Sequence, residues 1–388
     1  MREPIEQRRR RILSVVESRG PVRVSDLAVE LEVSVVTVRR DVEDLARAGR
    51  LRRGHGIARP VITAETTSGP AEPGGDLGAV ALVVPERHSY LYETLHGART
   101  VLEEAGVHIA LHIAPKAPGT ERLIVEKALA GGASGLLIAP RWRSAATEEA
   151  DYAWLAALDV PTVIMERRPR PGSALHATDS VCSDHGYGVH LAVEHLVSLG
   201  HRRIVLAARD DSPTARAIRV AFARIAAERP EIEDAILVLS SPDAVADPAP
   251  ETGRSAAPPL DLAAVLRERR ATGAVLHGDE DAVMLVQRLA DSGIRVPRDC
   301  SVVAYDDTVA GLSSTPLTAV APPKAEVGRA AAELLIRRMG AGGAASGPVR
   351  RIELLPELKV RGSTQPPAEP PAQSATHPAT QPPPESAL

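Results

Sequence analysis

The chain has 388 residues, 44% of them hydrophobic, and a net charge of −4 at pH 7, so it can form two or three domains with substantial cores. It has no apolar run of about eighteen residues and begins Met-Arg-Glu-Pro-Ile-Glu-Gln, which excludes a membrane span and argues against an export signal. Cys182 and Cys300 are isolated, so we expect reduced thiols and neither disulfides nor a metal site. These features predict a cytoplasmic protein.

The charge is unevenly distributed along the chain. Residues 1–60 hold 14 basic and 9 acidic side chains, a net charge of +5, which leaves −9 for residues 61–388. A cationic segment on an anionic body favours contact with nucleic acid through one end only, because phosphate repels the body. Only four of the 46 basic residues are lysines, a bias that we attribute to a G+C-rich genome.

The N-terminal segment predicts two helices separated by a break. A basic run at residues 8–11 leads into the first helix, and Gly20-Pro21 ends it. Ser25 is expected to cap the second helix. The inward-facing residues of the two helices are Ile12, Val15, Val16, Leu27, Ala28 and Leu31.

A third helix is predicted after Ser34, whose hydroxyl can accept from the free N–H groups of the first turn. Its apolar stripe consists of Val35, Val38, Val42 and Leu45. Off the stripe, and free to face a ligand, lie Thr37, Arg39, Arg40 and Asp41. An exposed Arg–Arg pair on a capped helix suits phosphate neutralisation and bidentate contact with guanine.

Two short helices joined by a tight turn, the second of them basic, predict a helix-turn-helix. Segments 22–24 and 51–53 could pair as the small sheet of a winged variant. The tip of that wing would be Gly54-His55-Gly56, where glycine permits a close approach to a duplex.

This pattern, including Thr37-Val-Arg-Arg40 and the wing tip, resembles the DeoR-type winged helix-turn-helix over residues 8–58. The resemblance implies a double-stranded DNA operator as partner. The residues expected at the DNA are Ser34, Thr37, Arg39, Arg40, Arg53 and His55. The alternative is a solvated basic helix in some other small domain.

Three segments lack an apolar period and are rich in proline and small residues. Residues 59–78 predict a flexible linker after a DNA-binding domain at 1–58, and residues 240–259 are a second such stretch. Residues 365–388 predict a disordered tail after a second domain at 79–364.

Within that second domain, short apolar runs alternate with amphipathic segments. The predicted strands are 80–84, 108–113, 136–139, 162–165, 204–208, 236–239, 275–277 and 302–305. The predicted helices include 95–104, 123–130, 189–199 and 282–291. The alternation predicts an α/β fold with helices on both faces of parallel sheets, and about eight strands in two runs of four favour two lobes over a barrel.

The order of several landmarks resembles the effector domain of LacI/GalR-family repressors, which is itself similar to periplasmic sugar-binding proteins. These landmarks include Asp184-His-Gly-Tyr-Gly188, Ala304-Tyr-Asp-Asp307 and Pro316-Leu-Thr-Ala-Val320. The resemblance covers residues 78–364. It implies two lobes of Rossmann-type sheets joined by three chain crossings, a sugar-like ligand between the lobes, and a homodimer.

The chain departs from that family in three places. The family's own DNA-binding head and hinge helix are absent, and the linker takes their place. The arginine that grips the sugar aligns with Ile218, while Arg216 and Arg219 lie nearby on the same helix. The glutamine-like position after the Pro-Leu-Thr strand is Pro322. The identity of the ligand is therefore open.

The carboxyl ends of parallel strands open on the crevice, which makes polar residues at these ends ligand candidates. The set comprises Tyr90, Tyr92, Arg141, Glu166, Asp184, Arg216, Asp279 and Asp306. Carboxylates accept strong hydrogen bonds from hydroxyls, so a neutral sugar or polyol is expected over a sugar phosphate, although Arg141 and Arg167 could serve a phosphate. Each carboxylate could instead be a helix N-cap or a surface group.

Aromatic residues are scarce, with one Phe, two Trp and five Tyr. Tyr90 and Tyr92 follow the first strand of the second domain, and Tyr187 and Tyr305 fall near the crevice. A ring with a polar tip suits a pyranose, and the alternative for each is half-buried packing.

We interpret the chain as a DNA-binding repressor that a sugar-like effector releases, with activation or a corepressor left open. An enzyme is the rival hypothesis, but no Gly-x-Gly-x-x-Gly follows a strand, and no Gly-x-Ser-x-Gly or phosphate loop occurs. No His-x-x-x-His pair has a carboxylate partner, so we expect no cofactor and no metal. A transport receptor would need the export signal that we do not find.

Overall fold

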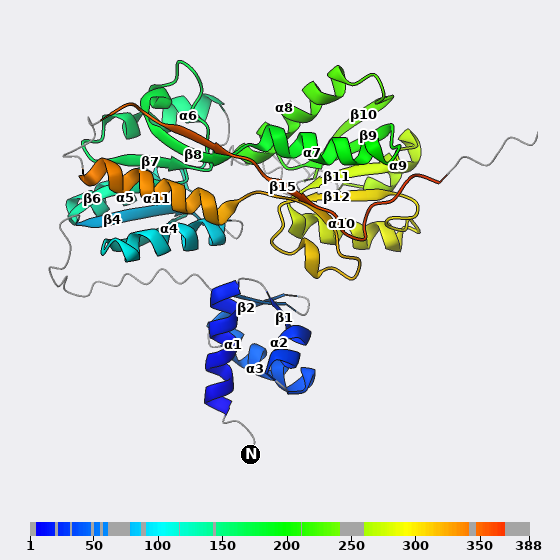
Figure 1. The fold of residues 1–388 in the computed structure, drawn as a ribbon, viewed down its shortest axis with the longest axis horizontal. Helices are drawn as coiled ribbons and strands as arrows, with labels where there is room; N and C mark the ends of the chain where they lie inside the picture. The colour runs from blue at the N-terminus through cyan, green and yellow to red at the C-terminus, as the bar shows by residue number, and fades with distance from the viewer. Residues whose placement is uncertain are drawn as a thin grey trace, which may run out of the picture.

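The computed structural model describes residues 5–19, 22–31, 33–47, 50–54, 57–60, 78–86, 91–115, 117–142, 145–210, 212–240, 260–340 and 347–368. These residues form a small N-terminal domain, here called the head, and a body of two lobes (Figure 1). Several predictions lie outside the described residues: His55, Tyr90, most of both linker-like stretches and the tail from residue 369.

The head contains three helices and a three-stranded sheet. Its elements are α1 (Ile5–Arg19), β1 (Val22–Arg23), α2 (Val24–Glu30), α3 (Val35–Arg47), β2 (Leu51–Gly54) and β3 (Ile57–Pro60). One core cluster joins the three helices to the sheet. Strands β2 and β3 form the expected antiparallel wing, but β1 pairs with β3 and not with β2 as predicted. β3 runs to Pro60, two residues past the expected end of the domain at 58.

Two local predictions in the head are wrong. Ser25 lies inside α2, whose N-cap is Arg23, and its hydroxyl donates to Asp26 Oδ1 at 3.0 Å. Asp41 does not face a ligand: it is 3% exposed, and its oxygens accept from Arg8 Nε at 2.6 Å and Arg9 Nε at 3.0 Å. A buried carboxylate needs paired charge, so part of the basic run at 8–11 binds α1 to α3.

The N-terminal lobe is a parallel six-stranded sheet with the strand order β14-β8-β7-β6-β4-β5. Its strands are β4 (Ala79–Pro85), β5 (His108–Ala114), β6 (Ala133–Ile138), β7 (Thr162–Met165), β8 (Asp179–Ser183) and β14 (Arg351–Leu354). Its helices are α4 (Tyr92–Glu104), α5 (Thr120–Ala130), α6 (Ala145–Tyr152), α11 (Lys324–Gly340) and the 3₁₀ turns η2 (Ala153–Ala157) and η3 (Ala174–Ala177). Separate core clusters fill the two faces, one under α4 and α11 and one under α5.

The C-terminal lobe has a second six-stranded sheet with the order β10-β9-β11-β12-β13-β15, antiparallel only at β15. Its strands are β9 (Arg203–Ala208), β10 (Asp234–Leu239), β11 (Gly273–His277), β12 (Ser301–Tyr305), β13 (Thr318–Ala321) and β15 (Glu357–Lys359). Its helices are α7 (His185–Ser198), α8 (Pro213–Glu228), α9 (Leu262–Arg269), α10 (Asp279–Asp291) and the 3₁₀ turn η4 (Ala310–Leu312). Here α9 and α10 cover one face, and α7 and α8 cover the other.

The chain passes between the lobes three times, as the resemblance implied. The crossings connect β8 to α7, β13 to α11 and β14 to β15, so α11 belongs to the N-terminal lobe although it follows a strand of the C-terminal lobe (Figure 1). The α/β class and the two lobes are confirmed. The number of strands was predicted too low, because each lobe has six strands and not four.

The C-terminal end of the body extends further than predicted. Gln365 was assigned to the disordered tail, but its carbonyl accepts from Ser301 Oγ at 2.8 Å, and its N–H donates to the same hydroxyl at 2.9 Å. The ring of His201 also lies 2.9 Å from that carbonyl. These contacts attach the first residues of the predicted tail to the C-terminal lobe. As expected, both cysteines are free thiols, and both are buried.

Candidate functional site

The start of α3 has the predicted cap. Ser34 Oγ accepts from the N–H of Thr37 at 3.2 Å, and the two hydroxyl oxygens are 2.8 Å apart. This arrangement satisfies one of the N–H groups that a helix leaves free at its first turn. Ser34 and Thr37 are therefore held together at the end of the helix where base contacts are made in helix-turn-helix proteins.

The two faces of α3 are clearly separated. Val38, Val42 and Leu45 are buried, while Arg39 and Arg40 are exposed. Val35 was predicted to belong to the buried stripe but is 41% exposed, because the core of the head begins one turn further along the helix. The DNA contacts of Thr37, Arg39 and Arg40 stay predictions. Arg53 lies on β2 of the wing, as predicted.

In the body, Glu166 and Asp306 follow β7 and β12, one in each lobe, and share an unusual backbone conformation. Their φ angles are +53° and +76°, in the left-handed region that non-glycine residues seldom adopt. Such strain is kept where the surrounding structure over-determines it, which is typical of ligand sites and switches. Both residues lie at the carboxyl ends of central strands, as predicted.

Three of the predicted carboxylates, Glu166, Asp184 and Asp279, accept hydrogen bonds from within the protein. Glu166 is 4% exposed and accepts from the N–H of Ser183 at 3.3 Å and from its hydroxyl at 3.1 Å. Asp184 caps α7 by accepting from the N–H of Tyr187 at 2.9 Å. This is the N-cap alternative that the sequence left open.

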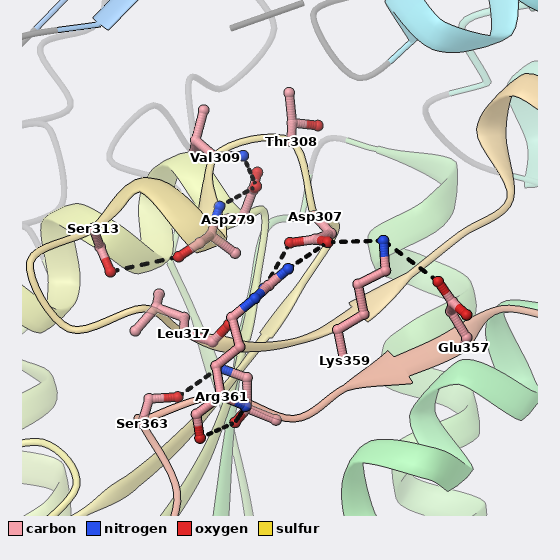
Figure 2. Close-up of polar contacts among 12 residues, drawn as sticks. Asp279, Asp307, Thr308, Val309, Ser313, Leu317, Glu357, Lys359, Arg361 and Ser363 are labelled. Carbon is pink, nitrogen blue, oxygen red and sulfur yellow. Dashed lines mark hydrogen bonds and ion pairs between the residues drawn. The ribbon is translucent and has the colours of Figure 1, made fainter. Parts of the chain in front are cut away.

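Asp279 is the most deeply buried of these carboxylates. One of its oxygens accepts from the N–H groups of Val309 and Ala310, the latter at 2.9 Å, and thereby holds the loop after β12 (Figure 2). Burial, with the nearby charge of Asp306, raises the pKa of Asp279 to about 6, and Lys324 opposes the shift.

Two side chains that the sequence reading of the site left out connect the lobes. Lys324, at the start of α11, is 3% exposed, and its Nζ donates to Thr308 Oγ1 at 2.8 Å and lies 3.9 Å from Asp306 Oδ1. Burial lowers the pKa of Lys324, but Asp306, Asp279, Glu93 and Glu166 outweigh it and raise the pKa. The rarity of lysine in this arginine-rich chain was the one available signal.

The second is His185, at the start of α7. Its Nδ1 is 3.1 Å from the hydroxyl of Tyr305, and its Nε2 is 3.9 Å from Glu166 Oε2. Burial lowers the pKa of His185 even though Glu166 and Asp306 oppose the shift, and it therefore favours the neutral ring. Glu166, Asp184, Asp279 and Asp306 thus surround one group of buried polar side chains.

The predicted arginines Arg141 and Arg216 both donate to backbone carbonyls of the N-terminal lobe. Arg216, on α8, donates to the carbonyl of Trp142 at 2.5 Å and so joins the C-terminal lobe to the loop after β6. Burial lowers its pKa, and Arg167 and Arg219 lower it further. Arg141 donates to the carbonyl of Ala114 at 3.1 Å, which places its guanidinium over the end of β5.

The tyrosines differ in burial, and Tyr305 follows the alternative of packing in the core. Tyr305 is fully buried, and its ring lies near those of His185 and His277. Tyr187 is 38% exposed, and Tyr92 is the half-buried first residue of α4. Tyr305 is therefore part of the lobe core beneath the crevice.

Beside the crevice, Asp307 anchors the last strand. Arg361 Nη1 and Nη2 each donate to this carboxylate at 2.8 Å, and Lys359 Nζ lies 3.3 Å from it, as Figure 2 shows. A bidentate arginine pair is geometrically specific and strong. It ties β15, which follows the third crossing, to the loop that carries Asp306 and Thr308.

The described residues contain no group of three or more histidine, cysteine, aspartate or glutamate side chains placed to hold a metal ion, and none of their helices has the length and hydrophobicity of a membrane span. Two cavities of about 350 and 360 Å³ lie between α9 and α10 and between α8 and β10, and neither includes a predicted ligand residue.

Comparison with known proteins assigns both parts of the chain. A family model for a DeoR-like helix-turn-helix domain matches residues 8–62, and one for a periplasmic binding protein-like domain matches residues 193–364. The arabinose metabolism transcriptional repressor of Geobacillus stearothermophilus is 28% identical over 88% of this chain and 90% of its own length. The transcriptional regulator MalR of Streptomyces coelicolor is 28% identical over 88% of this chain and 96% of its own length.

Among solved structures, a sugar-binding regulator of the LacI family from Escherichia coli, complexed with phosphate, is 25% identical with a TM-score of 0.56. The match covers 76% of this chain and 100% of the chain in that structure. These relatives are regulators of transcription. The chain therefore combines a DeoR-like helix-turn-helix domain with a periplasmic binding protein-like domain, and it is similar over most of its length to a transcriptional repressor.

Proposed function

We propose that this regulator is a repressor whose operator affinity is controlled by a sugar or polyol bound between the two lobes. The observation that carries the proposal is the group of buried polar side chains where the lobes meet. There, Lys324 of the N-terminal lobe contacts Thr308 and Asp306 of the C-terminal lobe, and strained Glu166 faces the same region. A ligand that inserts hydroxyls among these groups alters the contacts between the lobes, and so shifts the equilibrium between lobe arrangements.

The class of ligand follows from the same side chains. Glu166, Asp184, Asp279 and Asp306 keep acceptor capacity beyond the hydrogen bonds described above, since each carboxylate has about four lone-pair sites. Hydroxyl groups complement such acceptors without adding charge, whereas a phosphate would meet several carboxylates. A relative that represses arabinose metabolism and a sugar-binding structural neighbour support a sugar over other polyols.

On the DNA side, α3 and the wing supply the contacts. The exposed Arg39 and Arg40, with Thr37 at the capped end, would enter the major groove of a double-stranded operator, and Arg53 with His55 would follow the backbone from the wing. A homodimer in the cytoplasm would place two heads on a two-part operator. Effector binding would then change the geometry of the pair of heads and release the DNA.

The test is a thermal-shift screen of the full chain against monosaccharides, oligosaccharides and polyols, repeated with Asp306→Asn. Asparagine tolerates a positive φ, removes the charge and replaces one acceptor oxygen by a donor, so this variant should fold and lose at least roughly tenfold in affinity for the sugar that stabilises the wild type. Asp291→Asn is the control, because Asp291 lies at the opposite end of α10 from Asp279. Equal shifts in all three proteins would contradict the assigned site, and no shift with any compound would contradict the effector class.

A further inference from the structure

Val36 is an apolar side chain left in solvent at the start of α3. It is 74% exposed, whereas Val38 and Val42, later in the same helix, are fully buried. It lies between Ser34 and Thr37, the two residues of the capped turn. It does not belong to the hydrophobic core of the head.

The stability of the head does not explain a valine at this position. Valine is a weaker helix former than alanine because its branched side chain loses rotational freedom against the preceding turn. At this exposure it also gains little from burial. Isolated exposed apolar residues are common, so exposure alone would carry nothing, and its position on the helix is what matters.

Val36 shares the outward face of α3 with Arg40. Residues four apart lie one above the other on a helix, and side chains tilt towards the N-terminus, so Val36 extends ahead of Arg40. The N-terminal residues of a recognition helix are those that reach the base edges. The hydroxyls beside Val36 are engaged with each other, 2.8 Å apart, which leaves its isopropyl group as an apolar surface at this end.

In the major groove, the apolar group that a base presents is the C5-methyl of thymine. We propose that Val36 is a specificity-determining residue that reads this methyl group in the operator, beside the base pair contacted by Arg40. The inference rests on the proposed function of α3 as the recognition helix. It adds a preference for thymine that arginine cannot provide, because arginine contacts with bases favour guanine and its contacts with phosphate carry no sequence information.

The experiment first selects duplexes from a random pool with the full-length chain and then replaces each thymine of the selected site singly by deoxyuridine, which removes only the methyl group. We expect one thymine in each half-site at which the replacement weakens binding of the wild type roughly fourfold, the effect of one buried methyl. Val36→Ala should weaken binding of the thymine duplex by a similar factor and bind both duplexes equally, since the partner of the methyl is gone.

Val29→Ala is the matched control. Val29 is 79% exposed, lies on α2 and is also outside the head core, so its variant should keep the full thymine preference. The inference is overturned if every thymine tolerates replacement in the wild type, or if Val36→Ala keeps the preference. Failure of the pool to yield any bound duplex would instead overturn the proposed function, so the two failures are distinguishable.

Discussion

Arginines of the head serve two different purposes, and their surroundings separate them. Arg8 and Arg9 hold the buried Asp41, whereas Arg40 projects from α3 into solvent. We expect Arg40→Ala to weaken operator binding by about 1–3 kcal/mol, or roughly 5- to 150-fold, without changing stability or sugar affinity. A mobility-shift assay measures operator binding, and a thermal-shift assay measures stability and sugar affinity. Loss of sugar affinity with intact DNA binding would mean that the domains are wrongly assigned.

Asp279 gives the crevice a dependence on pH. Its pKa rises from 3.8 to about 6 on folding, so the folded state prefers the protonated acid, and the stability that the proton contributes is present below pH 4 and lost as pH rises through 6. The difference corresponds to about 3 kcal/mol. Asp279→Asn keeps an oxygen for the N–H groups of Val309 and Ala310 and cannot ionise.

The measurement for this prediction is urea unfolding of both proteins at pH 4.5 and 7.5. The wild type should lose stability relative to Asp279→Asn between these values, and the variant should be at least as stable at the higher pH. Parallel pH profiles would show that the carboxylate is ionised in the folded protein without cost, contrary to its burial.

The sequence predicted which carboxylates follow the strands, but it did not predict their partners. Strand ends can be recognised from apolar runs, which is why Glu166, Asp279 and Asp306 were placed at the correct edge. The partners of Asp279 are 30 residues away in the chain, and the capping role of Asp184 depends on backbone angles at the start of α7. Lys324 was not predicted as a site residue because it follows a strand of the C-terminal lobe in the sequence but belongs to the N-terminal lobe in the structure.

At the scale of elements, α4 and α11 pack unusually closely through two glycines. A Cβ at Gly328 would come within 1.9 Å of the Thr94 carbonyl oxygen, and one at Gly97 within 2.1 Å of the Ala325 carbonyl oxygen. Both obstacles are backbone atoms, so neither can move aside cheaply. Because α11 begins at the second crossing, this contact fixes where Lys324 enters the crevice.

We therefore expect Gly328→Ala to lower the free energy of unfolding by about 1–3 kcal/mol or more through overpacking, and to weaken sugar binding as Lys324 shifts. Gly340→Ala, at the far end of α11 with no atom within 4 Å of its new Cβ, is the control and should be neutral or stabilising. Urea denaturation compares the two. Equal stability of both variants would show that the helices separate without cost.

Elements with continuous apolar runs were predicted well, and those with other patterns were not. β8 is buried throughout, but it contains Asp179 and two serines; its carboxylate is bound by Arg338 Nε at 2.6 Å. The edge strands β14 and β15 alternate or are mostly exposed, so they lack the pattern of a buried parallel strand. A polar buried strand depends on a partner that local sequence does not reveal.

At the scale of the molecule, the head and the body differ in net charge, and three chain crossings connect the two lobes of the body. The head carries the net positive charge and the body the net negative charge, so DNA contact is directed to one end of the chain. In the proposed mechanism, the three crossings would let the lobes move relative to one another, and α11 and α7 would carry that change from the ligand site. In this proposal neither the head nor the body regulates transcription alone. The ligand can release the DNA only if it binds more tightly to the arrangement of the body that disfavours operator binding.

The most direct test of this coupling is DNase footprinting of the full chain on duplexes from its own chromosomal neighbourhood, at low ionic strength, with and without the sugar that raises its melting temperature. We expect a protected site with two parts, whose half-saturation concentration rises at least tenfold when the sugar is present. A footprint that is unchanged by a sugar known to bind, or no protected duplex under any condition, would contradict the account.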